Sequence, residues 1–308
     1  MSLLIPDARD HIDAHADLDQ DVLYQQLLTE ATLDTPNKFL WKFAPVDGFF
    51  KQSRQDTDDM EFNYITDNFG IRKSWNEITS ELEHLNRSSD DNTQYKLLFL
   101  ARHGQGWHNI ASQKYPKHEW MSKWRFLGSD GEITWGPDAD LTDLGIKQAQ
   151  ENCLAWNKQL SKNAPLPSKF FVSPLQRSIH TLKYTWEDKE IPRPVVLENL
   201  RETIGIHLCH QRSPKSVLEK QFEFLDFEES FEEDDLLMKK YSIKREELNQ
   251  QFLRVNGVLQ DIFDSDDEII SITSHAGTIR SFITVIGHRK FTIPVGGMIP
   301  IVVKGVRS

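Results

Sequence analysis

Residues 97–109 read Leu-Leu-Phe-Leu-Ala-Arg-His-Gly-Gln-Gly-Trp-His-Asn, and this stretch decides the fold class. Its apolar run, residues 97–100, predicts a buried strand. The run leads into Arg102, His103 and Gly104, and the carboxyl ends of parallel strands are where open α/β sheets bind their ligands. Gly104 lets the backbone turn there without a Cβ penalty. A cation beside an imidazole at this position predicts a pocket for a phosphate group.

Further strands and helices alternate downstream of this stretch. The expected strands are 169–172, 195–197, 268–273 and 299–305, and the expected helices are 143–159, 175–186 and 277–286. Such alternation predicts a mostly parallel sheet with right-handed crossovers. We therefore expect an α/β fold, a three-layer sandwich in which a mostly parallel central sheet is flanked by helices.

The two ends of the alternating region suggest how the chain is organised. We expect residues 1–94 to form an N-terminal extension packed on the main body, and residues 95–308 to form the main domain. One long, charged interval interrupts the alternation and predicts a helical insertion at about 213–263, and its acidic run 227–235 is expected to be solvated. The first 35 residues show a single short amphipathic helix, marked by Leu18, Val22, Leu23 and Leu27.

Composition narrows the class of protein. The 308 residues carry a formal net charge of -11, which argues against nucleic acid and anionic membranes as partners. The two cysteines cannot form a disulfide framework, so a reducing compartment is expected. The first residues lack the apolar core of a signal peptide, and no run of apolar residues is long enough to span a membrane. We expect a cytoplasmic protein, with the nucleus as a second location.

Four short segments carry side chains suited to phosphate chemistry, and each follows a predicted strand. They are residues 102–104 with Asn109, then 173–178, 200–202 and 274–277. Each has an ordinary structural explanation: Ser173 and Pro174 suit a helix start, Arg177 a surface ion pair, and a lone histidine a hydrogen-bonded loop. Because strand ends of one parallel sheet converge, the four together predict a single site. The chain contains no HExxH, P-loop or GxSxG motif.

Taken in order, these segments resemble the histidine phosphatase superfamily, which includes the cofactor-dependent phosphoglycerate mutases. The matching residues are 100–104 with Asn109, 140–142 with Gly145, Gln148 and Ala149, 173–175 with Arg177 and Thr181, 200–202, and 274–277. Residues 201–205 through Cys209 and Arg212, together with 43–52, resemble the fungal and plant phosphoglycerate mutase-like subgroup. His210 stands where that subgroup usually has an aspartate. Residues 95–308 would then form the histidine phosphatase domain.

The resemblance implies a role for each matching residue. His103 would be the nucleophile that forms a phosphohistidine, and a backbone carbonyl of Gly104 or of the following loop would fix its tautomer. Glu202 would be the general acid and base, a role that requires a raised pKa, which the adjacent phosphate charge could supply. The phosphate would be bound by Arg102, Asn109, Arg177 and by His275, which would be protonated beside the dianion and is also counted as catalytic. The expected substrate contacts are Gly104, Gln105, His210 and Arg212. No metal and no cofactor are expected.

Three functions remain open at this point. The first is a metal-independent phosphatase that hydrolyses a small phosphorylated metabolite. The second is a mutase that transfers phosphate within a sugar-phosphate type of substrate. A mutase should carry extra basic residues around its site, whereas the predicted insertion is acidic, so hydrolysis is favoured. The third is a non-catalytic binding protein on the same fold, although such a protein would usually lack at least one of the matching residues.

Overall fold

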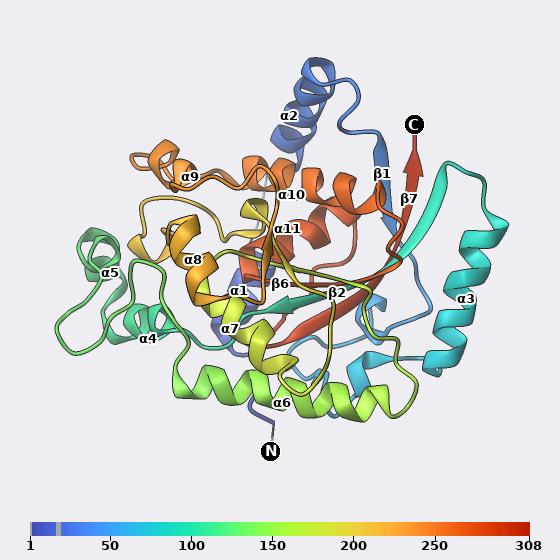
Figure 1. Ribbon diagram of the computed structural model, residues 1–308, viewed down its shortest axis with the longest axis horizontal. Coiled ribbons are helices and arrows are strands. Elements are labelled where there is room, and N and C mark those ends of the chain that lie inside the picture. The colour runs from blue at the N-terminus through green and yellow to red at the C-terminus, as the bar shows by residue number, and fades with distance from the viewer. Residues whose placement is uncertain (1, 17–19) are drawn as a thin grey trace.

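Seven strands form one sheet in the order β1-β7-β2-β6-β3-β4-β5 in the computed structural model, which describes residues 2–16 and 20–308 (Figure 1). The strands are β1 Trp41–Pro45, β2 Thr93–Arg102, β3 Lys169–Val172, β4 Val195–Val196, β5 Asp226–Phe227, β6 Ile269–Ser274 and β7 Met298–Arg307. Strands β2, β6, β3, β4 and β5 run parallel, and β7 and β1 are antiparallel to their neighbours. The expected α/β fold with a mostly parallel sheet is confirmed.

Helices cover both faces of this sheet (Figure 1). On one face lie α3 Trp75–Ser88, α6 Asp143–Leu160 and α7 Gln176–Thr185, and on the other lie α10 Leu248–Phe263 and α11 Ala276–Ile286. Local sequence sets their ends. Ser74 and Glu77 form a capping box at the start of α3, and Gly287 ends α11 at φ 78. The apolar faces of both layers and the sheet enclose one large core.

Shorter helices gather near the carboxyl ends of the parallel strands. These are α4 Trp107–Lys114, α5 Lys117–Ser122, α8 Lys215–Gln221 and α9 Leu236–Lys240 (Figure 1). The 3-10 helices are η1 Lys51–Ser53, η2 Asn68–Gly70, η3 Trp124–Phe126, η4 Glu198–Leu200 and η5 Leu208–His210. In the described part of the chain, no helix combines the length and the apolar character needed to cross a membrane.

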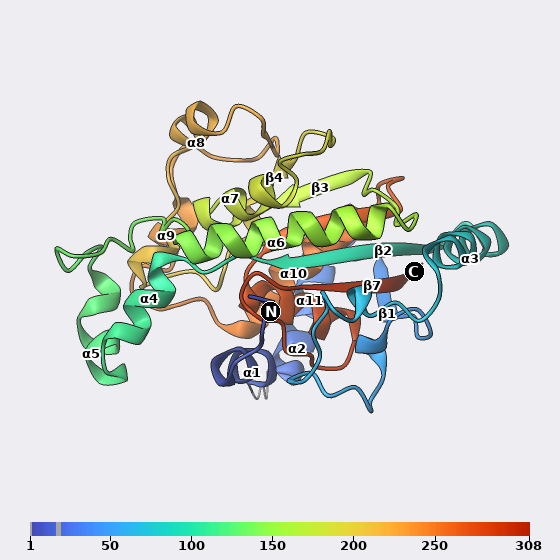
Figure 2. The same ribbon diagram turned by 90° about the horizontal axis from the view of Figure 1, so that it is seen from below.

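The N-terminal segment is more closely tied to the body than its sequence suggests. Strand β1 extends the sheet by pairing with β7, and helix α1 Ala8–His15 lies beside α11 (Figure 2). Helix α2 Asp21–Asp34 forms, but its predicted apolar stripe is wrong, because Val22 and Leu23 are exposed. The buried residue is Tyr24, which packs edge-on against Phe252 at 5.8 Å between ring centroids. Leu18 lies outside the described residues.

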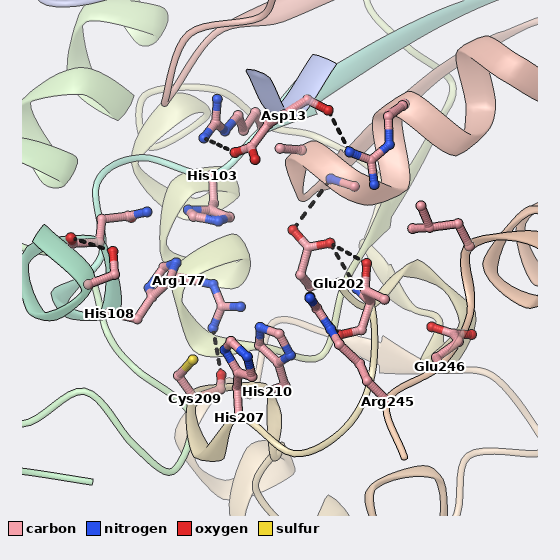
Figure 3. Close-up of a pocket in the computed structure, with 18 of the residues that line it drawn as sticks. Asp13, His103, His108, Arg177, Glu202, His207, Cys209, His210, Arg245 and Glu246 are labelled. Carbon is pink, nitrogen blue, oxygen red and sulfur yellow. Dashed lines mark hydrogen bonds and ion pairs between the residues drawn. The ribbon is translucent and has the colours of Figure 1, made fainter. Parts of the chain in front are cut away.

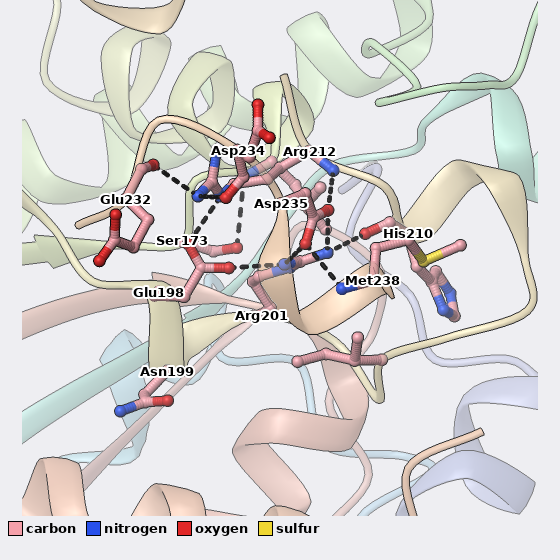
Figure 4. A network of polar contacts seen from close by, with 12 residues as sticks. Ser173, Glu198, Asn199, Arg201, His210, Arg212, Glu232, Asp234, Asp235 and Met238 are labelled. Carbon is pink, nitrogen blue, oxygen red and sulfur yellow. Dashed lines mark hydrogen bonds and ion pairs between the residues drawn. The ribbon is translucent and has the colours of Figure 1, made fainter. Parts of the chain in front are cut away.

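The interval 213–263 contains α8, β5, α9 and α10. The acidic run 227–235 was expected to be solvated, but one of its carboxylates, that of Asp235, is not. Asp235 is buried and accepts two hydrogen bonds from the fully buried Arg201, at 2.7 and 2.8 Å (Figure 4). This bidentate pair holds the acidic run against the strand end that carries Glu202.

Candidate active site

The carboxyl ends of the parallel strands surround a cavity of about 610 Å³ (Figure 3). Strand β2 leads to Arg102 and His103, β3 leads through a short turn to Arg177 on α7, and β4 leads through η4 to Glu202. Because these strands are parallel, residues up to 100 positions apart in the chain arrive at the same edge. Six of the residues named from the sequence line the cavity: Arg102, His103, Asn109, Arg177, Glu202 and His210.

His103 is held as a neutral imidazole. Its Nδ1 lies 2.7 Å from the carbonyl oxygen of Gly104, and a carbonyl can only accept, so Nδ1 carries the proton. The lone pair is then on Nε2. Burial, followed by the charge of Arg177, holds the pKa of His103 well below its ordinary value. The expected tautomer lock is therefore present, and it leaves on Nε2 a lone pair of the kind that nucleophilic attack requires.

Arg177 supplies a buried positive charge. Its side chain is completely buried on the first turn of α7, and one Nη1 hydrogen bond reaches the carbonyl oxygen of Cys209 at 3.1 Å. Its Nε has no hydrogen-bond partner among the residues that the structure describes. Burial lowers the pKa of Arg177, but the ordinary value is so high that the group stays charged. A buried cation with spare donors is suited to bind an anion.

Arg102 is shared between the cavity and the N-terminal helix. Its Nη1 donates to Asp10 Oδ1 at 2.6 Å and to the carbonyl oxygen of Ile293 at 2.8 Å. Part of the guanidinium expected to grip phosphate is therefore occupied by α1. Asn109, on α4, accepts a hydrogen bond from the backbone N–H of Gly106 at 2.9 Å through Oδ1, which leaves its Nδ2 as the donor available for an anion.

His275 lies beside His103 but does not itself line the cavity. It is fully buried, and its ring centroid lies 5.0 Å from that of His103. Burial, and then the charge of Arg177, holds the pKa of His275 well below its ordinary value, so the ring is neutral when no anion is bound. Its Nε2 lies 2.7 Å from the hydroxyl oxygen of Ser173. A dianion beside it would favour the protonated form.

Glu202 carries the carboxyl group of the cavity that was expected to act as acid and base. Burial raises its pKa, but the hydrogen bond from the backbone N–H of Thr203, at 2.8 Å, lowers it. Three nearby arginines lower it further, and the net pKa lies below its ordinary value; they are Arg245, Arg280 and Arg177. Glu202 is therefore ionised in the cavity without substrate, and the raised pKa that its expected role requires stays a prediction for the cavity with phosphate bound.

Three of the expected substrate contacts do not line this cavity. An added Cβ on Gly104 would lie 2.5 Å from the carbonyl oxygen of Gly145, so this glycine permits close packing of two backbone segments. Gln105 is engaged by Thr142, whose hydroxyl donates to its Oε1 at 2.8 Å. Arg212 is buried outside the cavity and donates to Glu198 Oε2 at 2.6 Å (Figure 4). Its role is structural, because four backbone carbonyls take its remaining donors.

Several cavity residues were not named from the sequence. Arg245 precedes α10, and Arg280 lies on α11 one turn after Gly277. Each has an Nε that is buried and lacks a partner within the described chain. Arg280 follows the 274–277 segment at helical spacing, a signal that could have identified it, whereas nothing in the charged interval 213–263 singles out Arg245. Asp13, His108 and His207 also line the cavity (Figure 3).

Known proteins resemble this chain in sequence and in fold. Residues 98–292 match the model of the histidine phosphatase superfamily (branch 1). A probable phosphoglycerate mutase from Arthroderma benhamiae is 34% identical over 284 residues, which cover 85% of this chain and 84% of that protein. The phosphomutase-like protein 3 of Candida albicans is 34% identical over 77% of this chain and 72% of its own.

Among solved structures, the ecdysone phosphate phosphatase of Bombix mori, in complex with tungstate, has a TM-score of 0.42 and 15% sequence identity. The match covers 66% of this chain and 87% of that one. The family assignment rests on the sequence matches. They cover most of the chain, and they include the cavity residues from Arg102 to Arg280. This chain belongs to the histidine phosphatase superfamily, branch 1, and has phosphoglycerate mutase-like relatives among the fungi.

Proposed function

We propose that this protein is a phosphatase that hydrolyses a small phosphomonoester through a phosphohistidine on His103. The observation that carries the proposal is the pairing of His103 Nδ1 with the Gly104 carbonyl at 2.7 Å. This contact fixes a neutral imidazole with its lone pair on Nε2, in a cavity that also contains the buried Arg177. A neutral nucleophile beside a fixed cation is what attack on a phosphate dianion requires.

In the first step, Nε2 of His103 forms a bond to phosphorus and the ester P–O bond breaks. The leaving oxygen takes a proton from Glu202. In the second step, a water molecule attacks phosphorus, its proton goes to Glu202, and the N–P bond breaks to release inorganic phosphate. Arg177, Arg102 and Asn109 would hold the phosphoryl oxygens in both steps.

Glu202 must be protonated before the first step, although it is ionised in the cavity without substrate. The incoming phosphate supplies the reason for the change, because a nearby negative charge raises the pKa of a carboxyl group. The same charge favours the protonated form of His275. Substrate binding would therefore bring both groups to the protonation states that the reaction needs, and no metal ion takes part in these steps.

The test is phosphate release from a panel of phosphomonoesters in the presence of EDTA. We expect the wild type to release phosphate and His103→Ala to release none. His84→Ala is the matched control, because His84 is exposed on α3 and does not line the cavity. Rapid quenching of the wild type should trap one phosphoryl group on His103. Turnover in His103→Ala equal to that of the control would overturn the proposal.

A mutase is the second candidate, and one observation favours it. From the sequence, the charged interval 213–263 was expected to be acidic and to bring no extra basic residues to the site. Arg245 from that interval nevertheless lines the cavity together with Arg280. These arginines could hold a second anionic group during transfer. A mutase would convert a monophosphate into its positional isomer without releasing phosphate. A folded protein that neither hydrolyses nor isomerises any substrate would instead point to a binding role.

A further inference from the structure

Two histidines of α1 and one aspartate of the body form a cluster outside the catalytic cavity. The histidines are His11 and His15, and the carboxylate is that of Asp59, in the loop after η1. One ligand atom from each lies within 4.8 Å of the other two. None of the three lines the cavity that contains His103. The catalytic mechanism proposed above does not use them.

The spacing of the two histidines is the first argument for a shared ligand. Residues four apart on an α-helix lie on the same face, so α1 presents both imidazoles to one point. Their ring centroids are 4.1 Å apart. Two histidines at this spacing on one helix, with a carboxylate from elsewhere, form a ligand set that divalent transition metals bind.

The surroundings of Asp59 are the second argument. Its Oδ2 accepts hydrogen bonds from the backbone N–H of Thr292 at 2.7 Å and from the Thr292 hydroxyl. Asp59 is buried, and these bonds fix the orientation of its carboxylate, as outer-shell partners do for metal-ligating side chains. The Thr292 hydroxyl also lies 3.3 Å from Nδ1 of His11, so one residue contacts two of the three members.

A simple ion pair explains part of the cluster. His15 Nε2 lies 2.7 Å from Asp59 Oδ2, which by itself would hold the end of α1 to the body. It does not explain why a second imidazole stacks on the first beside the same carboxylate. The helix dipole adds to this pair, because His15 lies in the last turn of α1, where positive charge is stabilised, whereas His11 lies in the middle of the helix.

We propose that His11, His15 and Asp59 bind a divalent transition metal of the Zn²⁺ class. The ion would fasten α1 to the body of the protein. Helix α1 also carries Asp10, which is bonded to Arg102 in the catalytic cavity. The metal would therefore stabilise the N-terminal segment next to the active site and take no part in phosphoryl transfer.

The test uses the untagged full chain, freed of metal with EDTA and then dialysed. Titration with Zn²⁺ should show binding at this site, and the midpoint of thermal unfolding should rise with Zn²⁺. In the double variant His11→Gln, His15→Gln, the stoichiometry should fall by one equivalent and the Zn²⁺-dependent rise should disappear. His84→Gln is the control, because it removes an exposed histidine from α3. Unchanged stoichiometry and an unchanged rise in the double variant would overturn the proposal.

A second variant covers the case in which the double variant does not fold. His11→Gln alone leaves the His15–Asp59 pair in place and should still weaken Zn²⁺ binding by at least about tenfold, the lower bound for losing even an outer-shell partner.

Another cluster of possible metal ligands, His207, Cys209 and His210, lies at the catalytic cavity, and the variant His207→Ala shows whether Zn²⁺ binds there instead. If that substitution, and not His11→Gln, removes the Zn²⁺ effect, the proposal is wrong. All of these measurements are made without substrate, so they do not depend on the proposed phosphatase activity.

Discussion

Asp10 on α1 and Arg102 at the end of β2 form a buried ion pair, with 2.6 Å between Oδ1 and Nη1. The two side chains are 4% and 6% exposed, so neither charge has water as an alternative partner. This pair joins a segment that the sequence placed outside the main body to an arginine expected to bind phosphate. It makes the N-terminal helix part of the wall of the active site.

Removing the charge of Asp10 should therefore affect both stability and anion binding. We expect Asp10→Asn to lower the free energy of unfolding by about 3–5 kcal/mol, because Arg102 is left as an uncompensated buried charge. Inorganic phosphate should then raise the unfolding midpoint of this variant more than that of the wild type, since the anion replaces the lost partner. Thermal unfolding with and without phosphate measures both effects. The exposed Asp91→Asn is the control, and an equal response to phosphate in all three proteins would contradict the prediction.

Loss of the Glu202 carboxyl should depend on the leaving group. Glu202→Gln cannot donate a proton, so hydrolysis of an alkyl phosphate should fall by about 10²- to 10⁴-fold. An aryl phosphate with an acidic leaving group needs no such proton, and its first step should be much less affected. The measurement is the rate of the first step on the two substrates, from the burst of leaving group and from kcat/KM, because the second step also needs Glu202 and its loss lowers kcat on both. The same fall of the first step on both substrates would show that Glu202 does not act as the acid.

Arg245 should matter for substrates that carry a second anionic group. We expect Arg245→Ala to raise KM for such a phosphomonoester by about 10- to 100-fold, which corresponds to the loss of a charge-assisted hydrogen bond. An aryl phosphate of similar size that carries no second anionic group should show little change. Arg87→Ala, on the exposed end of α3, is the matched control. Equal KM changes on both substrates would show that the charge of Arg245 favours any phosphate in the cavity, and that Arg245 does not recognise the second anionic group.

Arg212 offers the contrasting case of a structural arginine. Its guanidinium lies over the ring of Phe231, at 4.2 Å from the centroid, and is hydrogen-bonded to Glu198. We expect Arg212→Met to lower the free energy of unfolding by about 3–5 kcal/mol, because Glu198 loses a buried partner. KM for a phosphomonoester should stay as in the wild type in the folded protein. Urea unfolding and steady-state kinetics below the unfolding transition test this. A raised KM at full folding would restore the role first expected for Arg212.

The buried histidines should make folding sensitive to mild acid. Five histidines around the cavity have a lowered pKa, chiefly because they are buried: His103, His108, His210, His275 and His207, whose pKa falls to about 3. Unfolding exposes them, and their pKa then returns to about 6.5. The unfolded state therefore binds more protons below pH 6.5, and stability is lost as the pH falls through that value.

Each such group contributes up to about 1.4 kcal/mol per pH unit below its unfolded pKa. We expect the free energy of unfolding to be nearly flat from pH 8 to 7 and to fall steeply between pH 6.5 and 5. Inorganic phosphate should reduce the slope, because a bound anion favours protonated histidine in the folded state. Denaturant unfolding at a series of pH values measures the slope. A flat profile down to pH 5 would show that these rings are protonated in the folded protein.

Much of the sheet and of the phosphate pocket could be predicted from the sequence. Strand β2 contains an unbroken apolar run, residues 97–101, and the segments that hold His103, Arg177, Glu202 and His275 each follow a strand. The local pattern and the rule for parallel sheets therefore predict that these segments meet. The strands β1 and β5 were not predicted. Their pairing depends on distant partners, and β5 is two residues long, too short to show a periodic pattern.

What the sequence determined by itself is therefore the chemistry of the site: which residue types stand after which strands, and in what order. The tertiary structure decided how those residues behave. It placed Arg245 and Arg280 beside Glu202, which lowers the pKa of that carboxyl, and it turned Arg212 away into a network of carbonyls. It also brought Asp10 to Arg102 across 92 positions of chain. These outcomes depend on burial and on long-range contacts between charges, and both are properties of the folded chain that no local pattern of residues encodes.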